Sequence, residues 1–270
     1  MSSIPSELPP EFGHAFDAVG ARLGPLGSTI LFFTTIGSTN DVALRLAAGG
    51  DRLGAIVIAE QQTAGRGRRG RTWFSPPGSG LYVSIVLAPG RAAVDRTRAS
   101  TLVTLAVGVA LAEAIEASTG LRAAIKWPND LYVGRRKLAG ILAEAVAPDD
   151  DSVVVGYGIN VCRSAYPPEL ADRATSIETE LGRSVDRAAL CAESVAAVST
   201  RYANLLEGRF DAILDAWRER APASRGARVA WHSPAGPQHG ITAGIDDRGA
   251  LLVKVGERVE RIVGGEVVWE

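Results

Sequence analysis

The chain has 270 residues, of which 46% are hydrophobic and 6% aromatic, and it carries 29 basic and 30 acidic side chains. This composition is that of a globular protein and excludes a disordered, collagen-like or disulfide-stapled chain. The net charge of −1 creates no overall field that would attract nucleic acid or an acidic membrane, so any polyanion contact must come from a local cluster. Only three of the basic residues are lysines: Lys126, Lys137 and Lys254.

The histidines and cysteines exclude several kinds of catalytic site. The three histidines all lie near the chain ends, so the long central region has no imidazole for a catalytic triad or a His-ligated metal. Two cysteines, Cys162 and Cys191, are too few for a zinc site and do not indicate an oxidising compartment.

The longest apolar stretch, 102–112, contains Thr104 and is followed by Glu113. Because a bilayer span needs roughly 20 apolar residues, this stretch predicts a buried helix. The first residues have neither the basic region nor the apolar core of a secretion signal. We therefore expect a soluble, cytoplasmic protein without a membrane partner.

Taken in chain order, the predicted elements form a larger and a smaller unit. Residues 1–27 are expected to be an N-terminal tail or a short leading helix. A capped helix is predicted from Ser38 to the glycines at 49–50, and later helices at 95–119, 186–207 and 210–220. Strands are predicted at 30–34, 55–60, 81–88, 123–127, 138–147 and 152–159.

These strands are joined mostly by hairpin-length connections, which predicts an α+β fold with a mixed, largely antiparallel sheet and helices on one side. Beyond residue 223 the pattern changes to short alternating runs separated by glycine and proline, at 228–231, 240–245, 251–255 and 258–263. This pattern predicts a small β-barrel over 224–270, following a main domain over 28–223.

Residues 65–73 read Gly-Arg-Gly-Arg-Arg-Gly-Arg-Thr-Trp and contain both a GxGxxG pattern and a near match to a Walker motif. Both motifs require a helix that starts at the loop and points its N-terminus at phosphate. Here Trp73 is followed by Phe-Ser-Pro-Pro-Gly and a strand, so neither interpretation applies.

What remains is a flexible loop with four arginines in seven residues, and guanidinium groups pair well with carboxylate and phosphate. The loop therefore suits an anionic substrate pair such as ATP and a carboxylic acid. A solvated basic loop, or one that contacts nucleic-acid phosphates, is the alternative. Trp73 could stack on adenine or anchor the loop in the core.

A second cluster comprises Lys-Trp-Pro-Asn-Asp at 126–130 and Lys-Leu-Ala-Gly-Ile-Leu at 137–142. A hairpin turn around Gly134 would place Lys126 at the end of one strand and Lys137 at the start of the next. In a chain that otherwise uses arginine, lysines at these positions suggest a requirement for a compact charge, although strand-end lysines often serve only solubility. The glycines in Gly156-Tyr-Gly158-Ile-Asn160 suggest close backbone approach by a ligand.

Five motifs together resemble the biotin protein ligases in order and approximate spacing. They are Ser-Thr-Asn at 38–40, Gln62 with the loop 65–70, Lys-Trp-Pro-Asn-Asp at 126–130, Lys-Leu-Ala-Gly-Ile-Leu at 137–142 and Gly-Ile-Asn at 158–160. The resemblance covers about residues 30–265. It implies a catalytic domain related to class II aminoacyl-tRNA synthetases and lipoate ligases, followed by an SH3-like barrel.

The resemblance also implies an activity. Biotin and ATP would give biotinyl-5'-AMP and pyrophosphate, and a lysine of a biotin carboxyl carrier protein or domain would then accept biotin. Acetyl-CoA or acyl-CoA carboxylase and pyruvate carboxylase are the implied carrier proteins. Mg²⁺ is expected to shield the triphosphate with help from Asp130; no metal ligand is assigned with certainty.

The motifs also imply site residues. Lys137 and Arg66 are expected to be catalytic, with Lys137 stabilising the reacting carboxylate and phosphorus. The biotin site is expected to comprise Ser38, Thr39, Asn40, Gln62, Gly65, Arg66, Gly67, Arg68, Lys137, Gly140 and Gly158. The nucleotide site is expected to comprise Arg68, Arg71, Trp73, Lys126, Asn129, Asp130 and Asn160.

Several questions stay open at this stage. A lipoate-type ligase is the alternative within the same class, and a non-catalytic, biotin-sensing or DNA-binding regulator is the alternative from another class. The residues ahead of the first strand are too few for a winged helix-turn-helix, so we expect a monofunctional ligase that does not bind DNA. Arg258 and Arg261 are candidates to reach back toward nucleotide or carrier. A homodimer could form through a sheet edge or through the arginine loop.

Overall fold

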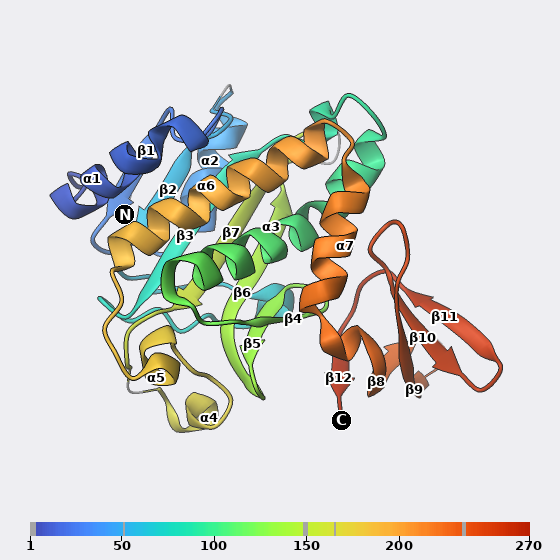
Figure 1. The fold of residues 1–270 in the computed structure, drawn as a ribbon. Helices are drawn as coiled ribbons and strands as arrows, with labels where there is room; N and C mark the ends of the chain where they lie inside the picture. Colours follow the sequence, from blue (N-terminus) through green and yellow to red (C-terminus); the bar gives the residue numbers. More distant parts are fainter. Residues whose placement is uncertain (1–3, 51, 148–150, 165, 234–235) are drawn as a thin grey trace.

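The computed structural model describes residues 4–50, 52–147, 151–164, 166–233 and 236–270. Its strands form a seven-stranded sheet and a separate five-stranded sheet (Figure 1). The fold is the expected α+β arrangement of a mixed sheet with helices followed by a small antiparallel unit. The arrangement places the arginine loop, the C-terminal strands and the centre of the larger sheet around one region.

The larger sheet has the strand order β1-β2-β3-β7-β6-β5-β4. Only β1 and β2 are parallel, and every other neighbouring pair is antiparallel. The long central pair β3 and β7 is in register from Gly80 opposite Asn160 to Leu87 opposite Val153. The strand bounds are β1 Ile30–Phe33, β2 Ile56–Ala59, β3 Gly80–Leu87, β4 Ala124–Lys126, β5 Asp130–Val133, β6 Arg136–Ala145 and β7 Val153–Asn160.

One face of this sheet is covered by α1, α3, α6 and α7 (Figure 1). The side chains of Asp95 and Asp186 cap the amino ends of α3 and α6, and Gly120 ends α3 in the left-handed conformation. Helix bounds are α1 Pro10–Val19, α2 Thr39–Ala48, α3 Arg96–Thr119, α4 Pro168–Ala171, α5 Ile177–Leu181, α6 Arg187–Leu206 and α7 Phe210–Arg220, with 3₁₀ turns η1 Gly20–Arg22, η2 Arg68–Gly70, η3 Pro89–Arg91 and η4 Pro222–Ser224.

Helix α3 is long and apolar enough to cross a membrane, but 72% of its most apolar window is buried inside the protein. It packs between the sheet and helices α6 and α7. Apolar residues all round a helix are expected where the helix is enclosed on every side. Residues 102–112 therefore form a core helix, as the sequence predicts.

The opposite face of the sheet carries α2, so the helices do not all lie on one side as the sequence predicts. Alternate residues of a strand point to opposite faces, so Ile56 and Ile58 of β2 join the main core while Val57 and Ala59 pack with α2. In β7 the same alternation leaves Gly156, Gly158 and Asn160 on the face that carries α2. The amino end of α2 thus lies beside a strip of sheet without large side chains.

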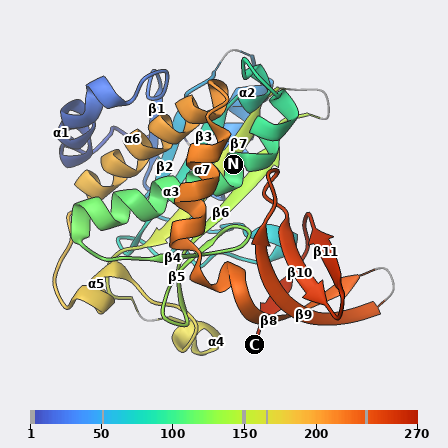
Figure 2. The ribbon, with the colours of Figure 1, turned by 45° about the vertical axis from the view of Figure 1, so that its right-hand side comes forward.

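The smaller sheet has the order β11-β10-β9-β8-β12 and is antiparallel throughout. It lies beside the β4 end of the larger sheet (Figure 2), where the Trp127 indole donates to the Gly249 carbonyl at 2.9 Å. Its strands are β8 Arg225–Ser233, β9 Gly236–Ile245, β10 Leu251–Val255, β11 Arg258–Ile262 and β12 Val267–Trp269.

Helix α1 is the short leading helix that was one of the two expectations for residues 1–27, and it buries Phe12 and Phe16 in the main core. Other local predictions need correction. The segment between Lys126 and Lys137 contains β5, so these lysines do not belong to consecutive strands. The strand β12 was also missed. The domain boundaries at residues 27 and 223 stay a prediction.

Candidate active site

A cavity of about 930 Å³ opens on the face of the larger sheet that carries α2. Its walls come from the amino end of α2, the arginine loop, the turn between β4 and β5, the start of β6, the end of β7 and the C-terminal residues. Every residue predicted for the biotin and nucleotide sites lines this cavity except Gly65. A Cβ atom on Gly65 would lie 2.6 Å from the Trp73 carbonyl oxygen, so this glycine allows the two ends of the loop to pack together.

Gln62 fixes the amino end of α2. Its side-chain oxygen Oε1 accepts hydrogen bonds from the backbone N–H of Thr39 at 2.9 Å and from the Thr39 hydroxyl at 3.1 Å. Ser38 occupies the N-cap position, but its side chain makes no capping hydrogen bond, so the predicted cap is wrong in this detail. Gln62 supplies the cap from another segment and holds the Ser-Thr-Asn motif against the cavity.

The amide of Asn40 is engaged by protein groups on both sides. Its Oδ1 accepts from the Ser84 hydroxyl at 2.5 Å, and its Nδ2 donates to Glu144 at 2.7 Å. A Cβ on Gly156 would lie 1.9 Å from Oδ1, so a larger residue there would displace Asn40. Asn40 is 3% exposed and acts chiefly to position the helix end against the sheet.

The arginine loop is a tight hairpin. The Gly67 N–H donates to the Arg71 carbonyl at 2.7 Å, and the Trp73 N–H donates to the Gly65 carbonyl at 2.8 Å. The turn contains a three-residue 3₁₀ segment but no α-helix, which agrees with the rejection of both phosphate-loop motifs. Arg69 has a φ angle of 58°, a conformation that costs energy for a residue with a side chain.

The arginines of this loop differ in their partners. Arg66 pairs with Asp41 at 2.9 Å and Glu144 at 2.8 Å, and Arg71 pairs with Glu266. Arg68 instead donates to the Asn129 side-chain oxygen at 3.2 Å and has no ion-pair partner among the described residues. Burial lowers the pKa of Arg68, because its charge is withdrawn from water. An anion in the cavity would therefore meet no competing ion-pair partner at Arg68 among the described residues.

Lys137 and Asp130 form the polar centre of the opposite wall. Lys137 Nζ lies 2.7 Å from Asp130 Oδ1 and 5.4 Å from the centre of the Trp73 ring. The backbone N–H of Lys137 donates to the Arg173 carbonyl at 2.8 Å, and its carbonyl accepts from Thr175 at 3.0 Å. The backbone of Lys137 is therefore fixed on both sides, while its ammonium group reaches the cavity.

Lys126 lies deeper in the same wall and has aromatic neighbours. Its Nζ lies 4.8 Å from the centre of the Tyr132 ring and 5.6 Å from that of the Trp269 ring. Burial lowers the pKa of Lys126, and the nearby Lys137 and Arg173 charges lower it further, against the opposing effect of Asp130. The scarce lysines at 126 and 137 thus meet at one cavity.

The floor of the cavity is made by glycines that Trp73 covers. A Cβ on Gly158 would lie 2.2 Å from Trp73 Nε1, and one on Gly140 would lie 3.0 Å from the same ring. Of the two glycines for which close approach was predicted, Gly156 is approached by Asn40 and Gly158 by Trp73, both of them protein side chains. Trp73 Nε1 is buried without a hydrogen-bond partner among the described residues, which leaves a donor available to a ligand.

Two asparagines complete the predicted set. The Asn129 side chain donates to the Ile141 carbonyl at 2.7 Å, and the Asn160 side chain donates to the Thr175 carbonyl at 3.0 Å. Each therefore holds a neighbouring segment against the sheet as well as lining the cavity.

Comparisons with known proteins identify the family of the chain. The model of the biotin/lipoate A/B protein ligase family matches residues 33–160, and that of the biotin protein ligase C-terminal domain matches residues 226–269. A biotin–[acetyl-CoA-carboxylase] ligase of Paracoccus denitrificans is 36% identical over 222 residues, which are 80% of this chain and 90% of that protein. The chain belongs to the biotin protein ligase family.

Other members extend the comparison. The bifunctional ligase/repressor BirA of Bacillus subtilis is 32% identical over 252 residues, covering 92% of this chain and 76% of that protein. The Aquifex aeolicus biotin protein ligase in complex with biotin and ATP superimposes with a TM-score of 0.77 and 28% identity, covering 90% of this chain and 99% of that one.

Several residues of this chain line the cavity although the sequence did not indicate them. Tyr132, Tyr166, Arg173 and the C-terminal stretch 265–270 line the cavity as well. Tyr132 lies in the unpredicted strand β5, and burial raises its pKa to about 12. The C-terminal residues reach the cavity only because β12 pairs with β8, which no local pattern indicates.

The side chains that line the cavity of this chain can hold a magnesium ion only if the substrate supplies most of the ligands. Among the described residues no group of three or more His, Cys, Asp or Glu side chains could hold a metal. Asp130 Oδ1 is buried and lacks a hydrogen-bond partner apart from its ion pair with Lys137. Mg²⁺ is often held by one or two carboxylates and substrate phosphates, and Asp130 suits that role.

Proposed function

We propose that this protein activates biotin with ATP and transfers it to a lysine of a biotin carboxyl carrier domain. The observation that carries the proposal is the meeting of the arginine loop and Lys137 at one cavity, although about 70 residues separate them in sequence. The Paracoccus relative, named a biotin–[acetyl-CoA-carboxylase] ligase, and the Aquifex complex with biotin and ATP support this choice of substrates and partner.

In the first step a biotin carboxylate oxygen attacks the α-phosphorus of ATP, and the bond to pyrophosphate breaks. Both reactants are anionic, so their approach costs Coulomb energy that nearby cations must offset. Arg68 and Lys137, which both line the cavity, supply this charge. Lys137 would exchange Asp130 for the carboxylate and the α-phosphate, and would stabilise charge that develops at phosphorus.

The loop residues orient and enclose the substrates. Arg66 is held by Asp41 and Glu144, so its backbone and stem can form a fixed edge of the biotin site with Ser38, Thr39 and Gln62. Closing of the loop residues 65–73 over the adenylate would exclude water from a reactive mixed anhydride. Arg71, Trp73, Lys126, Asn129 and Asn160 are proposed to face the nucleotide.

Mg²⁺ is proposed to accompany ATP, where it would neutralise the phosphates, with Asp130 as the ligand from this chain. In the second step the amine of the carrier lysine attacks the acyl carbonyl, AMP leaves, and an amide bond forms. We further propose a cytoplasmic location and no binding to DNA.

The proposal is tested by measuring pyrophosphate release from ATP with biotin or lipoate as the acid. Biotin-dependent release, followed by biotin transfer to a purified carrier domain, is the expected result. Turnover with lipoate alone would instead assign a lipoate-type ligase. A DNA mobility shift at physiological salt without ATP turnover would assign a regulator.

A further inference from the structure

Glu144 lies near the end of β6, two residues beyond Leu142 and on the same face of the sheet. Leu142 lines the substrate cavity, whereas Glu144 does not. One oxygen of the Glu144 carboxylate, Oε2, accepts a hydrogen bond from the Asn40 amide at 2.7 Å and another from the Arg66 guanidinium at 2.8 Å. A single carboxylate oxygen therefore joins the amino end of α2 to the arginine loop.

Glu144 is the main acceptor for the buried amide of Asn40. This amide is 3% exposed, and its other contact, with the Leu142 carbonyl, is long at 3.5 Å. Arg66 has a second partner, Asp41, at 2.9 Å. Loss of Glu144 would thus leave Asn40 without a good acceptor, while Arg66 would keep one ion pair.

Asn40 connects this link to the rest of its motif. Its Oδ1 accepts from the Ser84 hydroxyl, which lies 2.8 Å from the Thr39 hydroxyl. Ser84 is fully buried and, like Glu144, does not line the cavity. Two residues outside the cavity therefore fix the side chains of two residues that line it.

The series of polar contacts ends at the far end of the arginine loop. Gln62, which accepts from Thr39, donates from Nε2 to the Ser75 hydroxyl at 3.0 Å. The Ser75 hydroxyl donates to the Trp73 carbonyl at 3.0 Å. Consecutive contacts thus run from the first arginine of the loop, through β6, α2 and β3, back to its last residue.

A carboxylate suits the position of Glu144 better than a neutral group does. Two donors share its Oε2, and hydrogen bonds to an ionised acceptor are roughly twice as strong as those to a neutral one. The side chain of Glu144 is 28% exposed, and that of Asp41 is 42% exposed. Water screens the pair with Asp41 more strongly, so Glu144 is the firmer of the two partners of Arg66.

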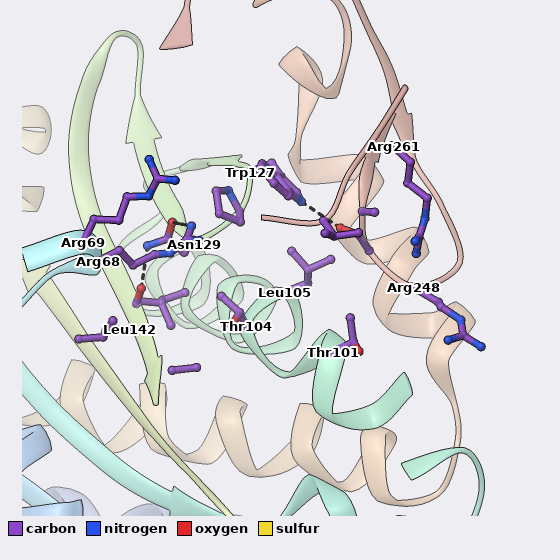
Figure 3. Close-up of a pocket in the computed structure, with 16 residues that line it drawn as sticks. Arg68, Arg69, Thr101, Thr104, Leu105, Trp127, Asn129, Leu142, Arg248 and Arg261 are labelled. Atoms are coloured by element: carbon purple, nitrogen blue, oxygen red, sulfur yellow. Dashed lines mark hydrogen bonds between the residues drawn. The ribbon is translucent and has the colours of Figure 1, made fainter. Parts of the chain in front are cut away.

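We propose that Glu144 is a positioning residue that holds the arginine loop against α2 and thereby fixes the shape of the biotin site. It acts through Arg66 and Asn40. The inference rests on the proposed function, because the two segments that Glu144 joins are those proposed to bind biotin. Other contacts hold the nucleotide side, such as the hydrogen bond from Arg68 to Asn129 (Figure 3), so Glu144 should affect biotin more than ATP.

The first experiment needs no substrate. Trypsin cleaves after arginine, so its rate of cleavage within residues 68–71 of the folded protein reports how often the loop opens. We expect E144Q to raise this rate at least about fivefold, because the charged acceptor of Arg66 is lost. E193Q removes a carboxylate from a partly exposed pair with Arg22, away from the cavity, and should leave the rate within about twofold.

A double substitution tests whether Glu144 acts through Arg66. Adding E144Q to R66Q should raise the cleavage rate by less than about twofold, since the partner is already absent. D41N should have a smaller effect than E144Q, because Asn40 keeps its acceptor. The proposal is overturned if E144Q does not speed cleavage of the loop, if its full effect persists in R66Q, or if cleavage rises equally throughout the chain.

Binding and kinetics separate this inference from the proposed function. E144Q should raise the Kd for biotin, measured by calorimetry without ATP, at least about fivefold, while the KM for ATP stays within about twofold. Equal losses for biotin and ATP would indicate a general structural defect and would also overturn the inference. If the unmodified protein binds no biotin, the proposed function fails, and the cleavage rates still decide whether Glu144 holds the loop.

Discussion

Lys137 and Asp130 face each other from adjacent strands, with Nζ 2.7 Å from Oδ1. Asp130 also opposes Lys126 in the register of β4 and β5, so one carboxylate serves two lysines of the cavity. The side chains of the 2.7 Å pair are 30% and 22% exposed, so solvent reaches the pair and weakens its attraction. The pair is therefore suited to exchange partners when an anionic substrate enters.

Lys137→Ala should lower the rate of adenylate formation by about 10²-fold or more, because a charged donor at the reacting phosphate is lost. The fold should be kept, since the backbone contacts of Lys137 remain. Biotin-dependent pyrophosphate release in a rapid-quench experiment measures the effect, and Lys254→Ala is the control. A burst of pyrophosphate close to that of the unmodified protein would refute the role of Lys137.

Arg68→Gly should release biotinyl-AMP into solution, because the loop loses its hydrogen bond to Asn129 and its charge beside the substrates. Chromatography of the reaction mixture without carrier measures the free adenylate. Arg91→Gly removes a similar charge from an exposed position outside the cavity and should release none. If free adenylate stays undetectable in Arg68→Gly, Arg68 does not retain the intermediate.

Gly158→Ala should displace Trp73, since the added methyl group would lie 2.2 Å from the indole nitrogen. Overpacking of this kind costs about 1–3 kcal/mol, and the loop can move more easily than the central strand. We expect a change in tryptophan fluorescence and at least about tenfold weaker biotin binding. Gly13→Ala, where nothing lies within 4 Å, is the control and should leave both unchanged.

The sequence predicted the parts of the fold that local patterns determine. Continuous apolar runs indicated β2, β3 and β7, and the helices predicted at 95–119 and 186–207 correspond to α3 and α6. The strand β5 was not predicted, because it is short, lies between two turns and has only Leu131 fully buried. For residues 1–27 the sequence left a tail and a short helix as alternatives, because Phe12 and Phe16 of α1 are buried only against the assembled core.

The sequence indicated the positively charged residues that line the cavity, but not the carboxylates that pair with them. Motifs identified Arg66 and Arg71, whereas Glu144 and Glu266 reach them from 78 and 195 residues away. Such pairs depend on how distant elements pack, and no spacing in the sequence reveals them. The partners of the Asn40 amide, Ser84 and Glu144, were missed for the same reason, and the assignment of Asn40 to the biotin site stays a prediction.

Stability at alkaline pH should depend on Cys191. Burial raises the pKa of this thiol to about 12, against an ordinary value of 9.0. Above pH 9 the unfolded chain loses the thiol proton while the folded chain retains it, so the free energy of unfolding falls as pH rises from 9 toward 12. Tyr157, whose pKa burial also raises, contributes in the same direction at higher pH.

The contribution of the thiol is isolated by comparing the unmodified protein with Cys191→Ala in urea unfolding experiments between pH 7 and 10. The variant should lose some stability at pH 7, because a small cavity replaces the buried sulfur. The difference between the two proteins should shrink above pH 9, by up to about 1.4 kcal/mol for each pH unit. A difference that stays constant over this range would mean that the folded protein lets the thiol ionise.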